Sequence, residues 1–441
     1  MTDQQKLLNQ IRETQNVFWM NSLKKDFEEA MKMSRFSKQD VDDAEARLLR
    51  FAPYLAAVFA ETEATNGIIE SKLTEISALK KELEDFYHTE IKGAFFLKRD
   101  DSLPIAGTIK ARGAIYEVLK HAETLAMENG LLKSYEEDYT VFDSKEFREF
   151  FAHHRVMVGT TGNLGISVGV MSAALGFSVT VHMSVEAKQW KKDLLRGRGV
   201  TVVEHETNFT QAVENGRAQA EADSNCYFVD DEHSIELFLG YTVAGNRMKR
   251  QLADMNIQVD ADHPLFVYLP CGIGGSPGGI TFGLKQHFGD NVHCFFAEPA
   301  HMPSMLLGLA TEQFDGVTVT DFDIDAKTVM DGLAVPRTSG LVSKLMQYHF
   351  DGGYTLQEDE AMHWLAKMID VESIKLEPAA LAGVPGAAFL SSTESGQAYL
   401  DAKGLTEKMA NATHIAWATG GSMVPAEDME MFYQQGRSVT L

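Results

Sequence analysis

Short apolar runs alternate with helix-like stretches along the chain from about residue 94 onward. Short apolar runs bounded by turn residues are typical of buried strands, and apolar residues spaced by three and four are typical of helices. We expect strands at 94–97, 155–158, 177–183, 200–204, 226–229, 265–269, 292–297 and 415–418. Helices are expected at 114–119, 166–175, 185–195 and from a glycine-rich loop at 272–279 to about 288. This alternation predicts an α/β fold with mostly parallel sheets and helices on both faces.

The first 93 residues have a different pattern, in which charged and apolar residues mix at helical spacing. A capping-box pattern at 37–40 predicts the start of a helix over 41–51. The length of 441 residues favours two domains. We expect 1–119 and 255–441 to form a larger domain with a helical N-terminal extension, and 120–254 to form a smaller α/β domain.

The net charge of the chain limits the classes of molecule that it is expected to bind. The 40 basic and 63 acidic side chains give a formal net charge of −23. An acidic chain repels a nucleic-acid backbone, so no nucleic-acid partner is expected. The densest basic run is interpreted as the exposed face of one helix, and it comprises Lys188, Lys191, Lys192, Arg196 and Arg198.

Cysteine use and hydropathy indicate a cytoplasmic protein. The three cysteines are too widely spaced for a disulfide framework or a metal clip. The first twenty residues lack the apolar core of a secretory signal. No apolar stretch approaches the roughly 20 residues that a membrane-spanning helix needs, so no membrane partner is expected.

The loop Cys271-Gly272-Ile273-Gly274-Gly275-Ser276-Pro277-Gly278-Gly279 follows an expected strand and precedes an expected helix. Glycines let backbone N–H groups approach a ligand, and Pro277 suits the first position of a helix, whose N-terminus favours anions. A phosphate fits there without a side-chain cation. Pro277 breaks the dinucleotide fingerprint, and a Walker loop would need a lysine after its last glycine. The alternative is a tight structural turn.

Lys110 lies between apolar residues at an expected helix start, in Gly107-Thr108-Ile109-Lys110-Ala111-Arg112. Burial and the positive end of a helix both favour a neutral amine, the form that a Schiff-base lysine needs. The alternative is an ordinary exposed lysine, since most lysines are exposed.

Further candidate side chains also follow expected strands. The loop Gly159-Thr160-Thr161-Gly162-Asn163-Leu164-Gly165 could hold a carboxylate through hydroxyl, amide and helix-start N–H groups, or simply cap a helix. Thr419 begins the turn Thr419-Gly420-Gly421-Ser422, and Glu298 ends a strand where it could bind a cation or a surface partner. A neutralisable lysine, a phosphate cup, a partner for a ring nitrogen and a carboxylate loop together suit pyridoxal 5'-phosphate.

The segment Thr108-Ile109-Lys110-Ala111-Arg112-Gly113 resembles the Ser-x-Lys-x-Arg-Gly signature of the serine/threonine dehydratases. These are fold-type II pyridoxal-phosphate enzymes, similar to the β-subunit of tryptophan synthase. The resemblance covers nearly the whole chain and is carried by the segments 103–117, 159–165, 179–183, 266–279, 293–299, 331–335 and 376–378. Thr108 and Thr160 depart from the serine of many relatives, which changes the size of the pocket more than its chemistry.

The resemblance implies a role for each cofactor-binding residue. Lys110 would form the Schiff base, and Asn163 would donate a hydrogen bond to the phenolic oxygen. The backbone of Gly272, Ile273, Gly274 and Gly275 would hold the phosphate. Thr419 would face the pyridine nitrogen, and a neutral partner there suits elimination over transamination.

The resemblance also implies a substrate loop and a metal ion. Thr160, Thr161, Gly162, Asn163 and Leu164 would take the carboxylate of a small amino-acid substrate. Glu298, with backbone carbonyls near 333–335, would hold a monovalent cation, K⁺ in the first instance. The resemblance also suggests a monomer.

Within the family, the chain is similar to the branch that acts on D-amino acids. The resemblance therefore implies dehydration and deamination of D-serine to pyruvate and ammonia, with D-threonine as a slower second substrate. Two enzyme alternatives remain: an L-serine or L-threonine dehydratase, and another β-eliminating pyridoxal enzyme. A third alternative is an inactive amino-acid-binding protein on the same scaffold.

Overall fold

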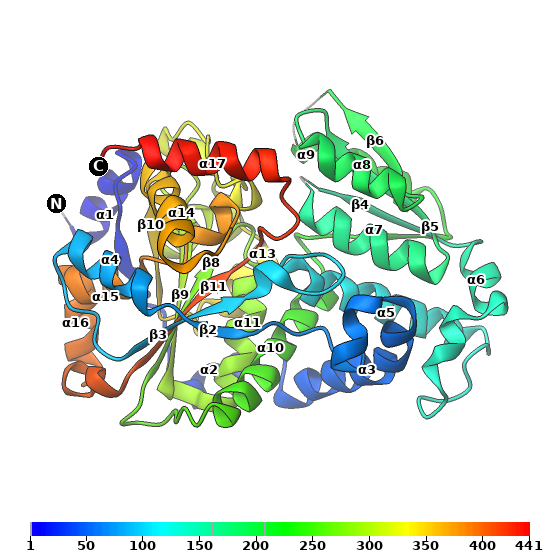
Figure 1. Cartoon of the computed structure of the whole chain (residues 1–441), viewed down its shortest axis with the longest axis horizontal. Coiled ribbons are helices and arrows are strands. Elements are labelled where there is room, and N and C mark those ends of the chain that lie inside the picture. Colours follow the sequence, from blue (N-terminus) through cyan, green and yellow to red (C-terminus); the bar gives the residue numbers. More distant parts are fainter. Residues whose placement is uncertain (1, 161, 207–208) are drawn as a thin grey trace. The chain divides into compact units, whose positions relative to one another are not determined.

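A computed structural model describes residues 2–160, 162–206 and 209–441, without the side chains of 209–212. The chain forms two compact units (Figure 1). The first comprises Met1–Lys38, Ser71–Ser102 and Ala244–Leu441, and the second comprises Gln39–Glu70 and Leu103–Val243. Among the described residues, no helix is both long and apolar enough to cross a membrane.

The first unit is built on a seven-stranded sheet in the order β1-β10-β9-β8-β11-β3-β2. The five central strands are parallel, and the two edge strands β1 and β2 are antiparallel to their neighbours. The strands are β1 Phe18–Met20, β2 Leu73–Glu75, β3 Ala94–Arg99, β8 Leu265–Pro270, β9 Val292–Pro299, β10 Gly352–Leu356 and β11 Thr413–Ala418. The helices are α1 Asp3–Arg12, α2 Phe27–Met33, α4 Ser77–Tyr87, α11 Gly275–Phe288, α12 Ser304–Ala310, α13 Gly340–Met346, α14 Glu358–Glu372, α15 Gly386–Ser392, α16 Glu394–Ala402 and α17 Ala426–Ser438.

The second unit is built on a four-stranded parallel sheet in the order β6-β5-β4-β7. Its strands are β4 Arg155–Gly159, β5 Ser178–Ser184, β6 Thr201–His205 and β7 Cys226–Val229. Its helices are α3 Lys38–Val58, α5 Lys110–Glu128, α6 Lys145–Phe151, α7 Asn163–Leu175, α8 Gln189–Gly197 and α9 Phe209–Glu221, and α10 Ile235–Asp254 crosses into the first unit. Successive β5 residues contact helices on opposite faces: a Cβ on Gly165 of α7 would meet Val181, and one on Gly216 of α9 would meet His182.

The α/β class and all eight expected strands are confirmed, with no end shifted by more than two residues. The pattern missed the short edge strands β1 and β2, as well as β10, whose Gly352-Gly353 start is a weak strand signal. Two helix starts were wrong. The helix expected from residue 185 begins at Gln189, and α11 begins at Gly275, which makes Pro277 its third residue and not its first.

The two units divide at residues other than those predicted. Residues 39–70 and 103–119, expected in the larger domain, fold with the smaller sheet. Within the second unit, long-range ion pairs join α3 to α5: Arg47 and Arg50 of α3 bind the buried Glu123 of α5 at 2.5 and 2.7 Å. Strands β2 and β3 of the first unit lie between α3 and α5 in sequence, so no local pattern indicates that these two helices belong to the same unit.

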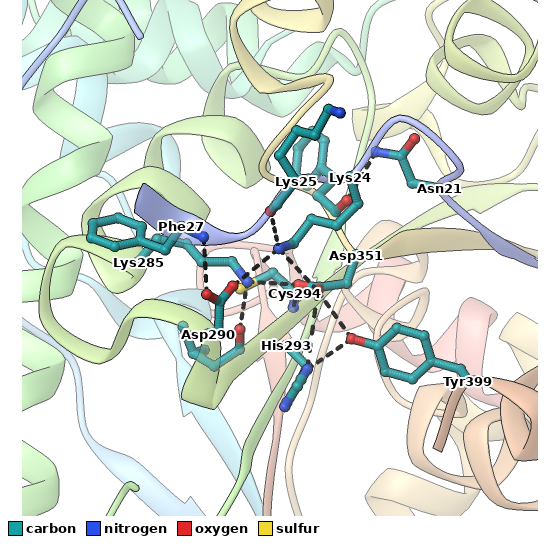
Figure 2. A network of polar contacts seen from close by, with 12 residues as sticks. Asn21, Lys24, Lys25, Phe27, Lys285, Asp290, His293, Cys294, Asp351 and Tyr399 are labelled. Atoms are coloured by element: carbon teal, nitrogen blue, oxygen red, sulfur yellow. Dashed lines mark hydrogen bonds and ion pairs between the residues drawn. The ribbon is translucent and has the colours of Figure 1, made fainter. Parts of the chain in front are cut away.

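A buried polar network centred on Asp351 fastens the N-terminal extension to the first unit (Figure 2). The Asp351 carboxylate accepts hydrogen bonds from Lys285 Nζ at 2.9 Å and from the Tyr399 hydroxyl at 3.0 Å. The Nζ atom of Lys24, in the N-terminal extension, lies 3.2 Å from Asp290 Oδ1 and 4.0 Å from Asp351 Oδ1. Burial alone would raise the pKa of Asp351, but the ammonium groups of Lys285 and Lys24 outweigh it and hold that pKa below its usual range.

Replacing Asp351 with asparagine is expected to lower the free energy of unfolding by about 3–5 kcal/mol, because it leaves the buried Lys285 ammonium without its counterion. Chemical denaturation at pH 7 measures the change. The matched control is Glu29→Gln, which removes the exposed pair between Glu29 and Lys25 at 3.4 Å. That change should cost under about 1 kcal/mol. Equal effects of the two variants would contradict a stabilising role for the network.

The same network predicts that the free energy of unfolding falls at low pH. A carboxyl whose pKa is lowered by folding adds stability above its unfolded pKa of about 3.9 and loses it as the pH falls towards the folded value. The stability of the wild type should therefore fall more steeply below about pH 4 than that of Asp351→Asn.

Candidate active site

The glycine loop of the first unit ends in an uncapped helix start. Strand β8 ends at Pro270, and α11 begins five residues later with Gly274 as its N-cap, at φ +113°. No side chain caps this helix, so its first N–H groups are left for a ligand. The Ile273 carbonyl accepts hydrogen bonds from the Ser339 N–H at 2.9 Å and from the Thr338 hydroxyl at 3.2 Å, which fixes the loop. The arrangement suits a phosphate.

Thr419 and Glu298 follow or end strands on either side of β8. Strand β11 runs into Thr419, which is buried, and β9 carries Glu298 near its end. Because β9, β8 and β11 are parallel neighbours, the glycine loop, Thr419 and Glu298 lie at the same edge of this sheet.

Glu298 is fully buried and caps the first turn of α12. Its two carboxylate oxygens accept the N–H groups of Met305 at 2.7 Å and Leu306 at 2.9 Å. Burial raises the pKa of Glu298 to about 8, although these N–H donors act in the opposite direction. None of the described cationic side chains forms an ion pair with it. A bound cation would favour the ionised form.

In the second unit, α5 begins at Lys110, as predicted. The preceding turn has positive φ at Ile105 (+76°) and Gly107 (+61°) and brings the chain abruptly into the helix. The Lys110 side chain is 19 % exposed, and its Nζ lies 3.1 Å from Asp231 Oδ2. The sequence did not predict a carboxylate this close to the amine.

Sequence reasoning missed Asp231. The residue lies two positions after the end of β7, and β7 is the neighbour of β4, whose end leads into the Thr160 loop. A carboxylate at a strand end beside another candidate loop was the available signal. The acidic run Asp-Asp-Glu at 230–232 makes this signal weak, because such runs are typical of exposed turns.

The segment that carries Asp231 is held against α5 by a buried carboxyl. Glu117, two turns after Lys110, accepts hydrogen bonds from the hydroxyls of Tyr227 and Ser234, both at 2.8 Å. Burial raises the pKa of Glu117 to about 8, and these two donors only partly offset it. Glu236 forms an ion pair with Lys120 one turn further along α5. These contacts on both sides of Asp231 fix its carboxylate beside Lys110.

The loop after β4 forms a helix start of its own. Thr160 is buried and its hydroxyl accepts the Gly162 N–H at 3.0 Å. Gly162 has φ +154° and is the N-cap of α7, which begins at Asn163. Leu164 is buried in the first turn, and Thr161 lies outside the described residues. As in α11, no side chain caps the helix, which leaves N–H groups for an anion such as a carboxylate.

The predicted site residues are thus divided between the two sheets. Lys110, Asn163 and the Thr160 loop belong to the second unit, whereas the glycine loop, Glu298 and Thr419 belong to the first. The glycine loop, Glu298, Thr419 and the Thr160 loop lie at the carboxyl ends of parallel strands, where α/β proteins bind ligands, whereas Lys110 begins a helix.

The expectation that the basic run is an exposed face is wrong for two of its members. Lys191 and Lys192 are 5 % and 2 % exposed, whereas Lys188, Arg196 and Arg198 are exposed as predicted.

Proteins that are similar to this chain indicate its family. The sequence profile of the family described as "Pyridoxal-phosphate dependent enzyme" matches residues 68–399. A protein of Geobacillus stearothermophilus called "Probable D-serine dehydratase" is 55 % identical over 430 residues, which cover 98 % of this chain and 94 % of that one. A protein of Bacillus cereus (strain B4264) with the same description is 54 % identical over 435 residues, covering 99 % and 97 % of the two chains.

Solved structures show a similar fold at low sequence identity. The holo diaminopropionate ammonia lyase of Escherichia coli has a TM-score of 0.71 at 16 % identity, covering 97 % of this chain and 99 % of that one. The processed form of threonine deaminase isoform 2 from Solanum lycopersicum has a TM-score of 0.60 at 20 % identity, covering 90 % and 89 %. At these sequence identities, both similarities show a shared fold.

Proposed function

The chain belongs to the pyridoxal-phosphate-dependent enzyme family, and we propose that it converts D-serine to pyruvate and ammonia by eliminating water. The observation that carries this proposal is the 55 % identity, over 98 % of the chain, with a protein described as a probable D-serine dehydratase. Lys110 at the start of α5 and the uncapped start of α11 supply the chemistry that such a reaction needs.

The residues of this chain fit the cofactor. A phosphate suits the uncapped, glycine-rich start of α11, where a Cβ on Gly274 would lie 2.3 Å from the Met305 methyl carbon. Thr108, two residues before Lys110, has a buried hydroxyl with no hydrogen-bond partner among the described residues. A buried hydroxyl without a partner is costly, and a polar ligand beside Lys110 would satisfy it.

We assign the cofactor contacts as follows. Lys110 holds the aldehyde carbon covalently, and the N–H groups of Gly272, Ile273, Gly274 and Gly275 hold the phosphate. Asn163 donates a hydrogen bond to the phenolic oxygen. Thr419 would offer the ring nitrogen a neutral hydroxyl and no carboxylate.

Pyridoxal phosphate, when bound, acts as an electron sink that weakens the Cα–H bond of an attached amino acid. The Thr160–Leu164 loop binds the carboxylate of the substrate and so orients Cα. Lys110 Nζ would take up the proton, and Asp231, whose Oδ2 lies 3.1 Å from it in this structure, would stabilise the ammonium. Loss of the Cα proton and of hydroxide from Cβ yields an enamine, which tautomerises and hydrolyses to pyruvate and ammonia.

The stereochemical part of the proposal rests on the relatives. The Cα–H bond must stand perpendicular to the cofactor plane to break, and Lys110 reaches only one face of that plane. With the carboxylate held by the 160–164 loop, exchange of enantiomers swaps the hydrogen and the side chain. The full-length match to proteins described as D-serine dehydratases favours the D enantiomer.

The decisive measurement is pyruvate release from D-serine, D-threonine, L-serine and L-threonine, each assayed separately. D-Serine should be the fastest and D-threonine the second, and Cα deuteration of D-serine should slow the reaction if proton removal limits the rate. Faster turnover of an L substrate would assign the chain to the L-serine or L-threonine dehydratases. No turnover of any of them would leave an amino-acid-binding protein.

We also propose a monovalent cation, K⁺ in the first instance, near Glu298. The support is a fully buried carboxylate that has two N–H donors and no ion pair among the described residues. A cation beside it would offset the cost of burying the charge. We propose further that the protein acts as a monomer in the cytoplasm.

Activity in K⁺ is expected to exceed activity in a bulky organic cation at equal ionic strength. Glu298→Gln should reduce the difference, because the amide keeps one acceptor oxygen and loses the charge that attracts the cation. Initial rates of both proteins in the two salts measure this. Equal rates of the wild type in the two salts would remove the cation from the proposal.

A further inference from the structure

Helix α8 packs closely against α7 at Gly162 and Gly169 of α7. This contact buries Lys191 of α8 beside the 160–164 loop. A Cβ on Gly169 of α7 would lie 2.6 Å from Leu195, and a Cβ on Gly162 would lie 2.3 Å from Lys191 Cδ and 3.0 Å from its Nζ. Gly162 and Gly169 are two helical turns apart, and Lys191 and Leu195 are one turn apart, so each pair lies along one face. The Lys191 ammonium therefore lies directly over the N-cap of α7.

Lys192, the next residue, has a different environment. Its Nζ donates to Glu204 Oε2 and to the Val185 carbonyl, both at 2.7 Å, which ties α8 to β6 and to the end of β5. Successive helical residues point about 100° apart, so Lys191 faces the Gly162 loop while Lys192 faces Glu204. The Trp190 ring, with its centroid 5.6 Å from Lys191 Nζ, gives that ammonium an apolar neighbour.

We propose that Lys191 is a substrate-binding residue that supplies the positive charge for the substrate carboxylate held by the 160–164 loop. This proposal rests on the proposed function, because it concerns the ligand of that loop. Sequence reasoning expected the loop to hold a carboxylate through neutral donors alone. The structure adds an ammonium beside its N-cap glycine.

The charge balance of the chain favours such a residue. With a net charge of −23, the protein as a whole repels a carboxylate, and a local cation would counter this repulsion. Lys191 is 5 % exposed, so water screens its field only weakly. A charge-assisted hydrogen bond is about twice as strong as a neutral one. Gly162 is the residue type that leaves room for the lysine side chain at this N-cap.

The test is the variant Lys191→Met, which keeps the length and apolar stem of the side chain and removes its charge. KM for D-serine should rise about tenfold to a hundredfold, while kcat changes by less than about threefold, because the carboxylate charge is unchanged in the transition state. D-Serinamide, which lacks that charge, should compete with D-serine equally well in the wild type and in the variant. The increase of KM with ionic strength that we expect of the wild type should be absent from Lys191→Met.

Two further variants separate binding from structure. Lys191→Arg should recover most of the affinity for D-serine, because it restores the charge. Lys192→Met should lower stability through loss of the Glu204 pair and leave KM unchanged. Near-wild-type KM in a folded, cofactor-loaded Lys191→Met would overturn the proposal, as would an equal loss of affinity for D-serine and D-serinamide. If the wild type releases no ammonia from D-serine, the proposed function itself fails.

Discussion

Lys110→Ala is expected to lower kcat for D-serine by more than about a thousandfold and to abolish covalent attachment of the cofactor. Only a primary amine can form the linkage. Among the described lysines that begin a helix, Lys110 alone directly follows a turn with positive φ. The checks are the pyruvate assay and peptide mapping after borohydride reduction, which should place the adduct on Lys110.

Lys110→Arg and Lys120→Ala are the matched controls. Arginine at 110 retains a cation for Asp231 and cannot form the linkage, so this variant should be folded and equally inactive. Lys120 lies on the same helix and forms an ion pair with Glu236, and its replacement should leave the linkage intact. An adduct on another lysine, or turnover by Lys110→Arg, would contradict the assignment.

Ser276→Asp is expected to weaken cofactor binding by at least a hundredfold, equivalent to about 3 kcal/mol. Ser276 is the second residue of α11, so a carboxylate there would lie in the first turn, at the N-terminus that we assign to the phosphate. Two anions in this partly buried position repel each other strongly. Fluorescence or absorbance titration of the apo protein with pyridoxal phosphate measures the change.

The same substitution leaves the fold intact for a specific reason. A carboxylate in the first turn of a helix is favourable to that helix, so the apo protein should be as stable as the wild type or more stable. Ser276→Asn is the neutral control and should bind the cofactor nearly normally. Undiminished affinity in Ser276→Asp would mean that the glycine loop is a structural turn.

Local features of the chain were predictable because they depend on neighbours in sequence. The eight strands follow from short apolar runs, and the start of α5 at Lys110 follows from the glycine turn before it. The positions of the glycine loop, the Thr160 loop, Thr419 and Glu298 at strand ends follow from the same pattern. Parallel neighbours then bring these ends to common edges, which is why a binding site could be anticipated without coordinates.

The ion pairs of Lys110 and Glu123 needed the tertiary structure. Asp231 is far from Lys110 in sequence, and it reaches Lys110 only because β7 and the segment after it pack on α5 through Glu117. In the same way, Glu123 pairs with Arg47 of α3, which is far from it in sequence and belongs to the same unit.

The burial of individual side chains also depended on tertiary packing and could not be predicted from the sequence. Lys191 and Lys192 belong to a basic run that the sequence predicts to be an exposed helix face. Both are buried, and no local sequence pattern indicates that α8 packs against the glycines of α7. The sequence by itself therefore determined the α/β class, the strand ends and the chemistry of the candidate residues, which depend on short-range patterns. Tertiary packing determined which charges meet, because an ion pair depends on distances in space that sequence spacing does not encode.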